Sequence, residues 1–259
     1  MQPTPRAVEM GPQVHAALTQ LQAALAPADF FPASSERRFA LVAGFYACAM
    51  LAPPLVARLA QEAPLAELAV AQYTEDVLDR MDAHRVDFLI GGIVGAPERF
   101  ARDVITTDGM AWVVRADHPL AELEDVDLQA LVSAPHVVIA PGLPGSDEGA
   151  ERRGLIGRAS WDDAGALDAA LAAEGLRRRI GVSVPDTYSA LSVASRSNMA
   201  ALIPRRLALM SAQGGRLKLI EPPYPSPTVD VSLLYLKERL ADPAIAWMRE
   251  LIRSTGASL

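Results

Sequence analysis

The chain has 259 residues, and 51% hydrophobic with 21% charged residues is the composition of a folded globular protein, not a disordered or fibrous one. Its 24 Lys and Arg against 31 Asp and Glu give a formal charge of −7, which argues against nucleic-acid binding by this chain itself. A lone cysteine, Cys48, excludes an internal disulfide and favours a reducing compartment, so we expect a cytoplasmic location.

The N-terminal segment predicts a helix over residues 6–26 that ends at Pro27. Val14, Leu18, Leu21 and Leu25 follow one another at spacings of four, three and four, which is a heptad-like seam. Such a seam fits a helix that pairs with another helix, and it also fits an amphipathic helix lying on its own domain. Residues 27–35 then form a Pro/Ala/Ser linker.

From residue 35 onward, strand and helix patterns alternate in two series of about 100 residues. Expected strands cover residues 38–44, 66–72, 86–91, 110–115, 136–140, 179–184, 199–203, 217–221 and 228–236. Expected helices cover residues 46–62, 75–83, 163–173, 187–194, a stretch from 204, and 243–252. This alternation predicts an α/β protein of two Rossmann-like lobes with mainly parallel sheets.

The expected division places residues 1–34 in the helix and linker, 35–115 plus 226–259 in lobe I, and 116–225 in lobe II. The chain then crosses between lobes near 115–119 and returns near the proline-rich segment 222–227. Two such crossings leave a central cleft at the carboxyl ends of the strands, where α/β folds bind small molecules.

Catalytic and cofactor motifs are absent from the sequence, so we expect neither an enzyme nor a bound cofactor. There is no nucleophile elbow, phosphate-binding loop or dinucleotide fingerprint. The histidines, at positions 15, 84, 118 and 136, lack the spacing of metal ligands, so no metal site is expected. Cys48 lies among Ala47, Ala49 and Met50 and is interpreted as a packing residue.

Two other segments are given structural interpretations. The glycine-rich stretch 139–149 could cradle a phosphate, but it has no lysine and is more typical of a loop leaving a sheet edge. The arginines at 177–179 and 205–206 could bind an anion, but such runs are more typical of solvated faces.

Two helix starts are the candidate binding elements. Gly44, Phe45 and Tyr46 follow the first strand, and residues 184–188 occupy the same place in the second series. Free N–H groups at both starts would favour a carboxylate in the cleft, and the aromatic rings would offer apolar contact.

Five segments occur in order along the chain: FPASSERRFALVAGFYACAMLAPPLVARLAQEAP (31–64), VDFLIGG (86–92), WVVRADHPLA (112–121), RRIGVSVPDTYSALSVASRSNMAALIPRRLA (178–208) and DPAIAWMRELI (242–252). Together they resemble the effector-binding domain of LysR-type transcriptional regulators, which has the type 2 periplasmic-binding-protein fold, and look closest to the nodulation and aromatic-degradation branch.

The resemblance implies a linker helix at residues 4–27 that pairs subunits in a homodimer or homotetramer. It also implies a small-molecule effector between the lobes, and DNA contact only through a winged helix-turn-helix that does not precede Thr4 here. The implied effector-binding residues are Gly44, Phe45, Tyr46, Gly92, Ile93, Val184, Pro185, Thr187, Tyr188 and, in a longer segment, Trp161. Many family members have Ser or Thr where this chain has Gly-Phe-Tyr, which argues against a strongly anionic effector.

A sensor domain for a small, partly apolar ligand such as an aromatic carboxylate is therefore the expected function. The alternative is an extracytoplasmic solute-binding protein of a transporter, for which no export signal is visible. An enzyme on the same scaffold would need an acid, base and nucleophile, and a redox sensor at Cys48 would need a resolving thiol.

Overall fold

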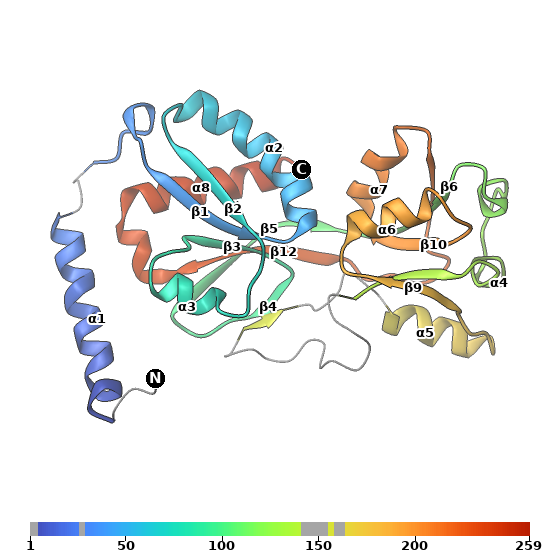
Figure 1. Ribbon diagram of the computed structural model, residues 1–259, viewed down its shortest axis with the longest axis horizontal. Coiled ribbons are helices and arrows are strands. Elements are labelled where there is room, and N and C mark those ends of the chain that lie inside the picture. Colours follow the sequence, from blue (N-terminus) through green and yellow to red (C-terminus); the bar gives the residue numbers. More distant parts are fainter. Residues whose placement is uncertain (1–4, 26–28, 141–154, 158–163) are drawn as a thin grey trace.

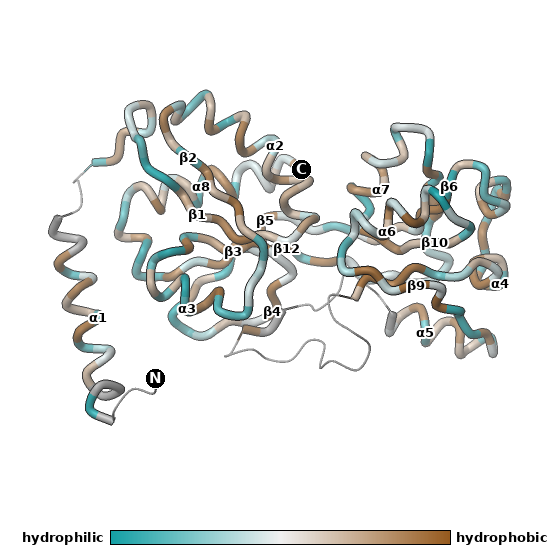
Figure 2. The backbone as a smooth tube through the Cα atoms, in the orientation of Figure 1, coloured by the Kyte–Doolittle hydropathy of each residue, from teal (hydrophilic) through white to brown (hydrophobic). Residues whose placement is uncertain are grey.

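Two five-stranded sheets, each covered by helices on both faces, make up the body of the computed structural model (Figure 1). The structure describes residues 5–25, 29–140, 155–157 and 164–259. Hydrophobic stretches follow the strands of both sheets (Figure 2). Among the described residues, no helix is both long enough and apolar enough to span a bilayer.

The first sheet has the strand order β2-β1-β3-β12-β5. Its strands are β1 (Arg38–Ala43), β2 (Glu67–Ala71), β3 (Phe88–Gly91), β5 (Phe100–Asp108) and β12 (Val229–Leu236). Its helices are α2 (Phe45–Glu62), α3 (Val77–Asp82), the 3-10 turn η3 (Lys237–Ala241) and α8 (Pro243–Ala257). Residues on one face of this sheet pack against α2 and α8, and those on the other face pack against α3.

The second sheet has the order β11-β6-β10-β7-β9. Its strands are β6 (Met110–Arg115), β7 (His136–Ile139), β9 (Ile180–Val184), β10 (Ala200–Pro204) and β11 (Leu217–Ile220). Its helical elements are η2 (Pro119–Ala121), α4 (Leu128–Leu131), α5 (Ala164–Ala173), α6 (Thr187–Ala194) and α7 (Arg205–Ala212). A short ribbon pairs β4 (Ile93–Gly95) with β8 (Ile156–Gly157).

The prediction of mainly parallel sheets is wrong, because each sheet has two parallel and two antiparallel pairings. In the first sheet β1 pairs in parallel with β2 and β3, whereas β12 runs antiparallel to β3 and β5. In the second, β7 pairs in parallel with β9 and β10, whereas β6 runs antiparallel to β10 and β11. The strands that make the antiparallel pairings are β12 in the first sheet and β6 in the second. Each is the strand with which the chain enters its sheet after leaving the other one.

The assignment of residues 110–115 to the first lobe is also wrong. β6 hydrogen-bonds with strands of the second sheet, so the chain crosses at Gly109 and not near residues 115–119. On the return, β11 of the second sheet ends at Ile220 and β12 of the first sheet begins at Val229. Asp108 pairs with Val229, which brings the two crossings side by side.

The N-terminal segment forms α1 (Pro5–Leu25), as predicted, and a short 3-10 turn, η1 (Pro32–Ser34), lies within the stretch predicted as a linker. α1 lies apart, beside the first sheet (Figure 1). Val14, Leu18 and Leu21 of the predicted seam are each about half exposed. A row of exposed leucine and valine on one helix face is apolar surface that pairing with another helix would bury.

The second core contains a histidine. His136 opens β7 and is fully buried, its ring centroid 4.5 Å from that of Trp112, with Nε2 3.2 Å from the carbonyl oxygen of Leu131. Burial lowers the pKa of His136, because an imidazolium in an apolar core loses its hydration; the hydrogen bond to Leu131 opposes this without reversing it. The folded chain therefore keeps this side chain neutral.

We expect the stability of the chain to fall as the pH drops below about 6.5, because the unfolded chain then binds a proton that folded His136 does not. One such proton gives a slope of at most about 1.4 kcal/mol per pH unit. Thermal unfolding between pH 5.5 and 7.5 measures it, and the His136→Leu variant should show a flatter profile. An unchanged slope in that variant would assign the effect to another group.

Candidate effector-binding site

The first predicted helix start is open at its N-terminus. β1 delivers the chain to Gly44, which is the N-cap of α2 and has no side chain to accept hydrogen bonds from the first-turn N–H groups. The dihedral angles of Gly44, φ −73° and ψ 169°, are still extended, so the helical conformation begins at the next residue, Phe45. The first turn of α2 therefore favours negative charge, as the sequence suggested.

The second helix start differs from the prediction of free N–H groups. Asp186 caps α6: one carboxylate oxygen accepts from the Ser189 backbone N–H at 2.8 Å and the other from its hydroxyl at 3.1 Å. An Asp at the N-cap position satisfies a first-turn donor and adds a negative charge. Anion binding is consequently favoured at α2 and disfavoured at α6.

Aromatic rings from the two helix starts meet. The ring centroids of Phe45 and Tyr188 lie 5.8 Å apart with planes tilted by 47°, an ordinary aromatic contact. Phe45 is half-buried and Tyr188 is 65% exposed. Leu191 of α6 packs against the cores of both sheets, which holds α6 against α2. The two sequence-distant segments therefore form one surface between the lobes.

Tyr46 is engaged inside the protein. It is buried, and its hydroxyl donates a 2.7 Å hydrogen bond to Asp108 at the end of β5. Asp108 also accepts from the Arg206 backbone N–H of α7 at 3.1 Å. Burial and the Asp108 carboxylate raise the pKa of Tyr46 far above its ordinary value, so the hydroxyl stays protonated. This side chain links α2, the interlobe crossing and α7.

The remaining predicted residues divide between surface and core. Pro185 is exposed and Gly92 partly exposed, whereas Ile93 packs under the first sheet and Val184 in the second core. Thr187 is only 3% exposed, and its hydroxyl has no hydrogen-bond partner within the described residues. Trp161 and most of the glycine-rich stretch 139–149 lie outside the described residues.

Arg205 and Arg206, for which the sequence favours a solvated face, are partly exposed, and both also bond to the interlobe crossings. The backbone N–H of Arg205 donates to the Gly109 carbonyl at 2.8 Å, and its side chain forms an ion pair with Glu221. The Arg206 guanidinium donates to the Thr107 carbonyl at 2.7 Å. The first turn of α7 is thus bonded to both interlobe crossings. A local sequence pattern could not predict these contacts.

Cys48 is half-buried, with Sγ 3.8 Å from the Ala43 carbonyl oxygen. Burial raises the pKa of the Cys48 thiol, so the nucleophilic thiolate is disfavoured. These observations support the interpretation of Cys48 as a packing residue.

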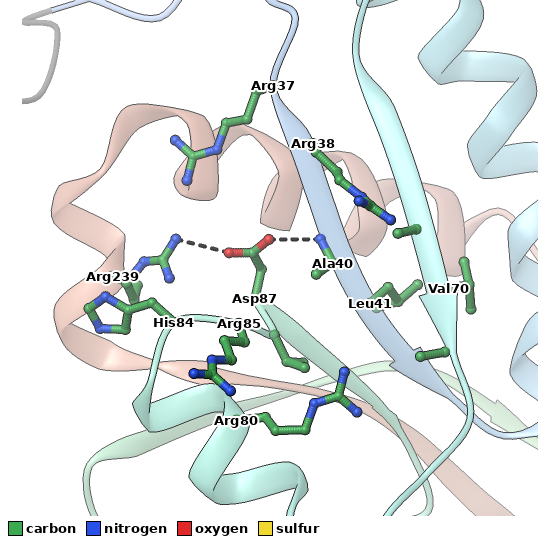
Figure 3. A pocket seen from close by; sticks show the side chains of 13 residues that line it. Arg37, Arg38, Ala40, Leu41, Val70, Arg80, His84, Arg85, Asp87 and Arg239 are labelled. Carbon is green, nitrogen blue, oxygen red and sulfur yellow. Dashed lines mark hydrogen bonds and ion pairs between the residues drawn. The ribbon is translucent and has the colours of Figure 1, made fainter.

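A pocket of about 590 Å³ lies elsewhere, at the amino ends of β1 and β3 and thus at the opposite end of these strands from the α2 start. Figure 3 shows the Asp87 carboxylate there between Arg239 and the Ala40 backbone, at 2.9 and 2.8 Å. Arg37 is likewise paired with Asp242 at 2.8 Å. The pocket is basic, yet acidic neighbours neutralise several of its arginines, and no local sequence pattern predicts it.

One group in the described part of the chain has the composition of a metal site. Ligand atoms of His15, His84 and Glu238 lie within 4.8 Å of one another, although the spacing of these residues in the sequence resembles no metal motif. His15 belongs to α1, which lies on the far side of the first lobe from the α2 start (Figure 1).

Comparison with known proteins agrees with this architecture. Residues 32–257 match the model of the LysR substrate-binding domain. Nodulation protein D 2 of Rhizobium tropici is 31% identical over 259 residues, covering 96% of this chain and 74% of that protein. The probable transcriptional regulator PA0477 of Pseudomonas aeruginosa has a TM-score of 0.70 at 28% identity, covering 98% of this chain and 78% of that one.

A further structural neighbour holds a ligand. The effector-binding domain of QuiR, solved in complex with shikimate, superimposes with a TM-score of 0.63 at 18% identity, covering 86% of this chain and 99% of that one. At this identity the likeness concerns the fold alone.

Proposed function

The chain belongs to the LysR substrate-binding domain family and is an effector-binding domain of a transcriptional regulator, not an enzyme; from this premise we propose that its effector binds between the two lobes, against the starts of α2 and α6. The observation that carries the proposal is the meeting of Phe45 from one lobe with Tyr188 from the other at 5.8 Å. A ligand that contacts both rings interacts with both lobes at once, as a sensor of lobe arrangement requires.

We assign the lobes by sheet membership: lobe I comprises the segment from residue 29 to Asp108 together with Val229 to the C-terminus, and lobe II the segment between. The proposed contact residues on lobe I are Gly44, Phe45 and Gly92, and those on lobe II are Pro185, Thr187 and Tyr188. Tyr46 is assigned to the interlobe crossing, because its hydroxyl is bonded to Asp108.

The chemistry of these groups favours a small aromatic carboxylate. Ring faces at Phe45 and Tyr188 favour an apolar, planar body, and the open start of α2 favours a negative group at one end. Asp186 at the start of α6 repels a second negative charge, so a monoanion fits better than a dianion. Binding would shift the population toward the lobe arrangement with the higher affinity.

The exposed apolar seam of α1 supports subunit pairing through this helix in a homodimer, with a homotetramer as the larger possibility. In this proposal the regulator acts in the cytoplasm and contacts DNA through a separate helix-turn-helix region of the full protein.

Calorimetric titration with benzoate and larger aromatic acids tests the site. We expect Phe45→Ala and Tyr188→Ala each to raise the Kd about 5- to 30-fold, the equivalent of roughly 1–2 kcal/mol for a lost ring contact. Thr187→Val, which removes a hydroxyl and keeps the shape, should raise it about 10-fold if that hydroxyl contacts the carboxylate.

Phe31→Ala is the matched control, because Phe31 is an exposed ring that belongs to neither helix start. Affinities equal to that of the unaltered chain in all three site variants would show that the site is wrong. Failure of the unaltered chain to bind any acid of the panel would instead reject the proposed effector class.

A further inference from the structure

Two histidines and a glutamate converge where α1 meets the first lobe. His15 of α1 lies with Nε2 2.9 Å from Oε1 of Glu238 in η3, and His84, after α3, lies with Nε2 3.4 Å from the same oxygen. The two imidazole rings meet edge to face with centroids 5.8 Å apart. We propose that these three side chains bind a divalent transition-metal ion of the Zn²⁺ class, which fastens α1 to lobe I.

The arrangement needs little adjustment to hold an ion. Ligand atoms around tetrahedral Zn²⁺ lie about 2.0–2.2 Å from the metal and therefore roughly 3.4 Å from one another. The three ligand atoms already lie within 4.8 Å of each other, and both Nε2 atoms face one carboxylate oxygen. All three side chains are partly exposed, so small rotamer changes can close the remaining distance, and water can supply the fourth ligand.

The donor set selects the class of metal. Imidazole nitrogen suits Zn²⁺ and its first-row neighbours, whereas Ca²⁺ and Mg²⁺ prefer oxygen ligands in larger numbers. With two nitrogens and one oxygen from the protein, the site is suited to Zn²⁺ and poorly suited to the alkaline-earth ions. No sequence motif indicates this site, because His15 and Glu238 are 223 positions apart.

The backbone at His84 is an independent feature of this site. Its φ of 56° is in the left-handed region, and among the described non-glycine residues it alone has a positive φ. An ordinary L-residue is disfavoured in this conformation, so such residues often have a local function. Here it accompanies an imidazole directed at Glu238.

Nearby positive charges limit the affinity. Arg85 follows His84 in the sequence, and Lys237 precedes Glu238; both are exposed. Arg239 follows Glu238. The charge of Arg239 is balanced by Asp87 at 2.9 Å and Asp242 at 3.9 Å. We therefore expect a Kd in the micromolar range rather than the far tighter binding of a closed structural zinc site.

Zinc titration of the metal-stripped chain by calorimetry should give one site per chain. We expect His15→Ala, His84→Ala and Glu238→Gln each to weaken binding at least 10-fold, because each removes one of three protein ligands. Glu36→Gln is the matched control, an exposed carboxylate outside the cluster. Circular dichroism checks that each variant is folded, and Glu238→Gln preserves size and shape.

Two further measurements locate the ion. Diethyl pyrocarbonate should modify His15 and His84 in the metal-free chain and not in the zinc-loaded one, while the buried His118 and His136 stay unmodified in both. Zinc should also slow hydrogen exchange in α1 of the unaltered chain and leave it unchanged in Glu238→Gln. No saturable binding, or variants that bind as tightly as the unaltered chain, would overturn the proposal.

Discussion

Replacing Asp108 by alanine is expected to lower the free energy of unfolding by about 2–6 kcal/mol. The buried carboxylate accepts from the Tyr46 hydroxyl and the Arg206 backbone N–H, at 2.7 and 3.1 Å. Its removal leaves two donors without this acceptor at the interlobe crossing, and a buried unsatisfied donor costs about 1–3 kcal/mol. For a chain of this size we expect Tm to fall by roughly 4–24 °C in a thermal unfolding scan.

Asp230→Ala is the matched control for this prediction. Asp230 is an exposed carboxylate that follows Val229, the residue paired with Asp108 across the sheet. It accepts a 2.8 Å hydrogen bond from the Thr107 hydroxyl. Its loss should change the stability by less than about 1 kcal/mol. Equal effects of the two substitutions would show that the buried network does not stabilise the fold.

Tyr46→Phe separates the two donors. It keeps the buried ring and removes the hydroxyl, while the Arg206 N–H still binds Asp108. The expected loss of stability is about 1–2 kcal/mol, smaller than that of Asp108→Ala. Equal losses for the two variants would show that the hydrogen bond from the Arg206 N–H of α7 to Asp108 adds nothing to the stability.

These contacts give the lobe arrangement a physical basis. α7 belongs to the second sheet, yet its first turn is bonded to Asp108, Gly109 and Glu221 on the two crossings. Leu207 of the same helix is buried in the core of the first lobe. A ligand between α2 and α6 would therefore act close to the elements that hold the lobes together, and a small local shift there would be transmitted to both crossings.

Most helices and strands could be predicted because their apolar spacing is local. α2, α6 and α8 were found within a few residues, since Gly44, Asp186 and Pro243 mark helix starts. β5 was missed. Ile105 is an extra residue opposite Val231 and Ser232, so the alternation of buried and exposed positions changes phase in the middle of the strand.

The candidate site could be predicted in part for the same reason. A strand followed by a helix identifies Phe45 and Tyr188 without any knowledge of the partner lobe. The bond between Tyr46 and Asp108 spans 62 positions, and that between His15 and Glu238 spans 223. Contacts at such separations depend on topology, and the antiparallel strands that set this topology were not evident in the local pattern.

Gly256→Val is expected to destabilise the chain by about 3 kcal/mol, because α8 lies directly against β5 at this glycine. A Cβ atom on Gly256 would lie 2.9 Å from the Ile105 carbonyl oxygen and 2.9 Å from its Cβ. The obstacle is partly backbone, which cannot rotate away as a side chain can, and overpacking of this kind costs about 1–3 kcal/mol or more. The clash would press on the bulge of the strand that leads to Asp108.

Gly165→Val in α5 is the matched control, because Gly165 is exposed and a Cβ there would meet no atom of the described residues within 4 Å. Valine has a somewhat higher helix propensity than glycine, so this change should be neutral or slightly stabilising. Thermal unfolding should show Tm lowered by about 6–12 °C for Gly256→Val alone. Since both substitutions add the same side chain to a helix, the difference between them measures how closely α8 packs on β5. Equal melting temperatures would mean that α8 can shift away from β5 without loss.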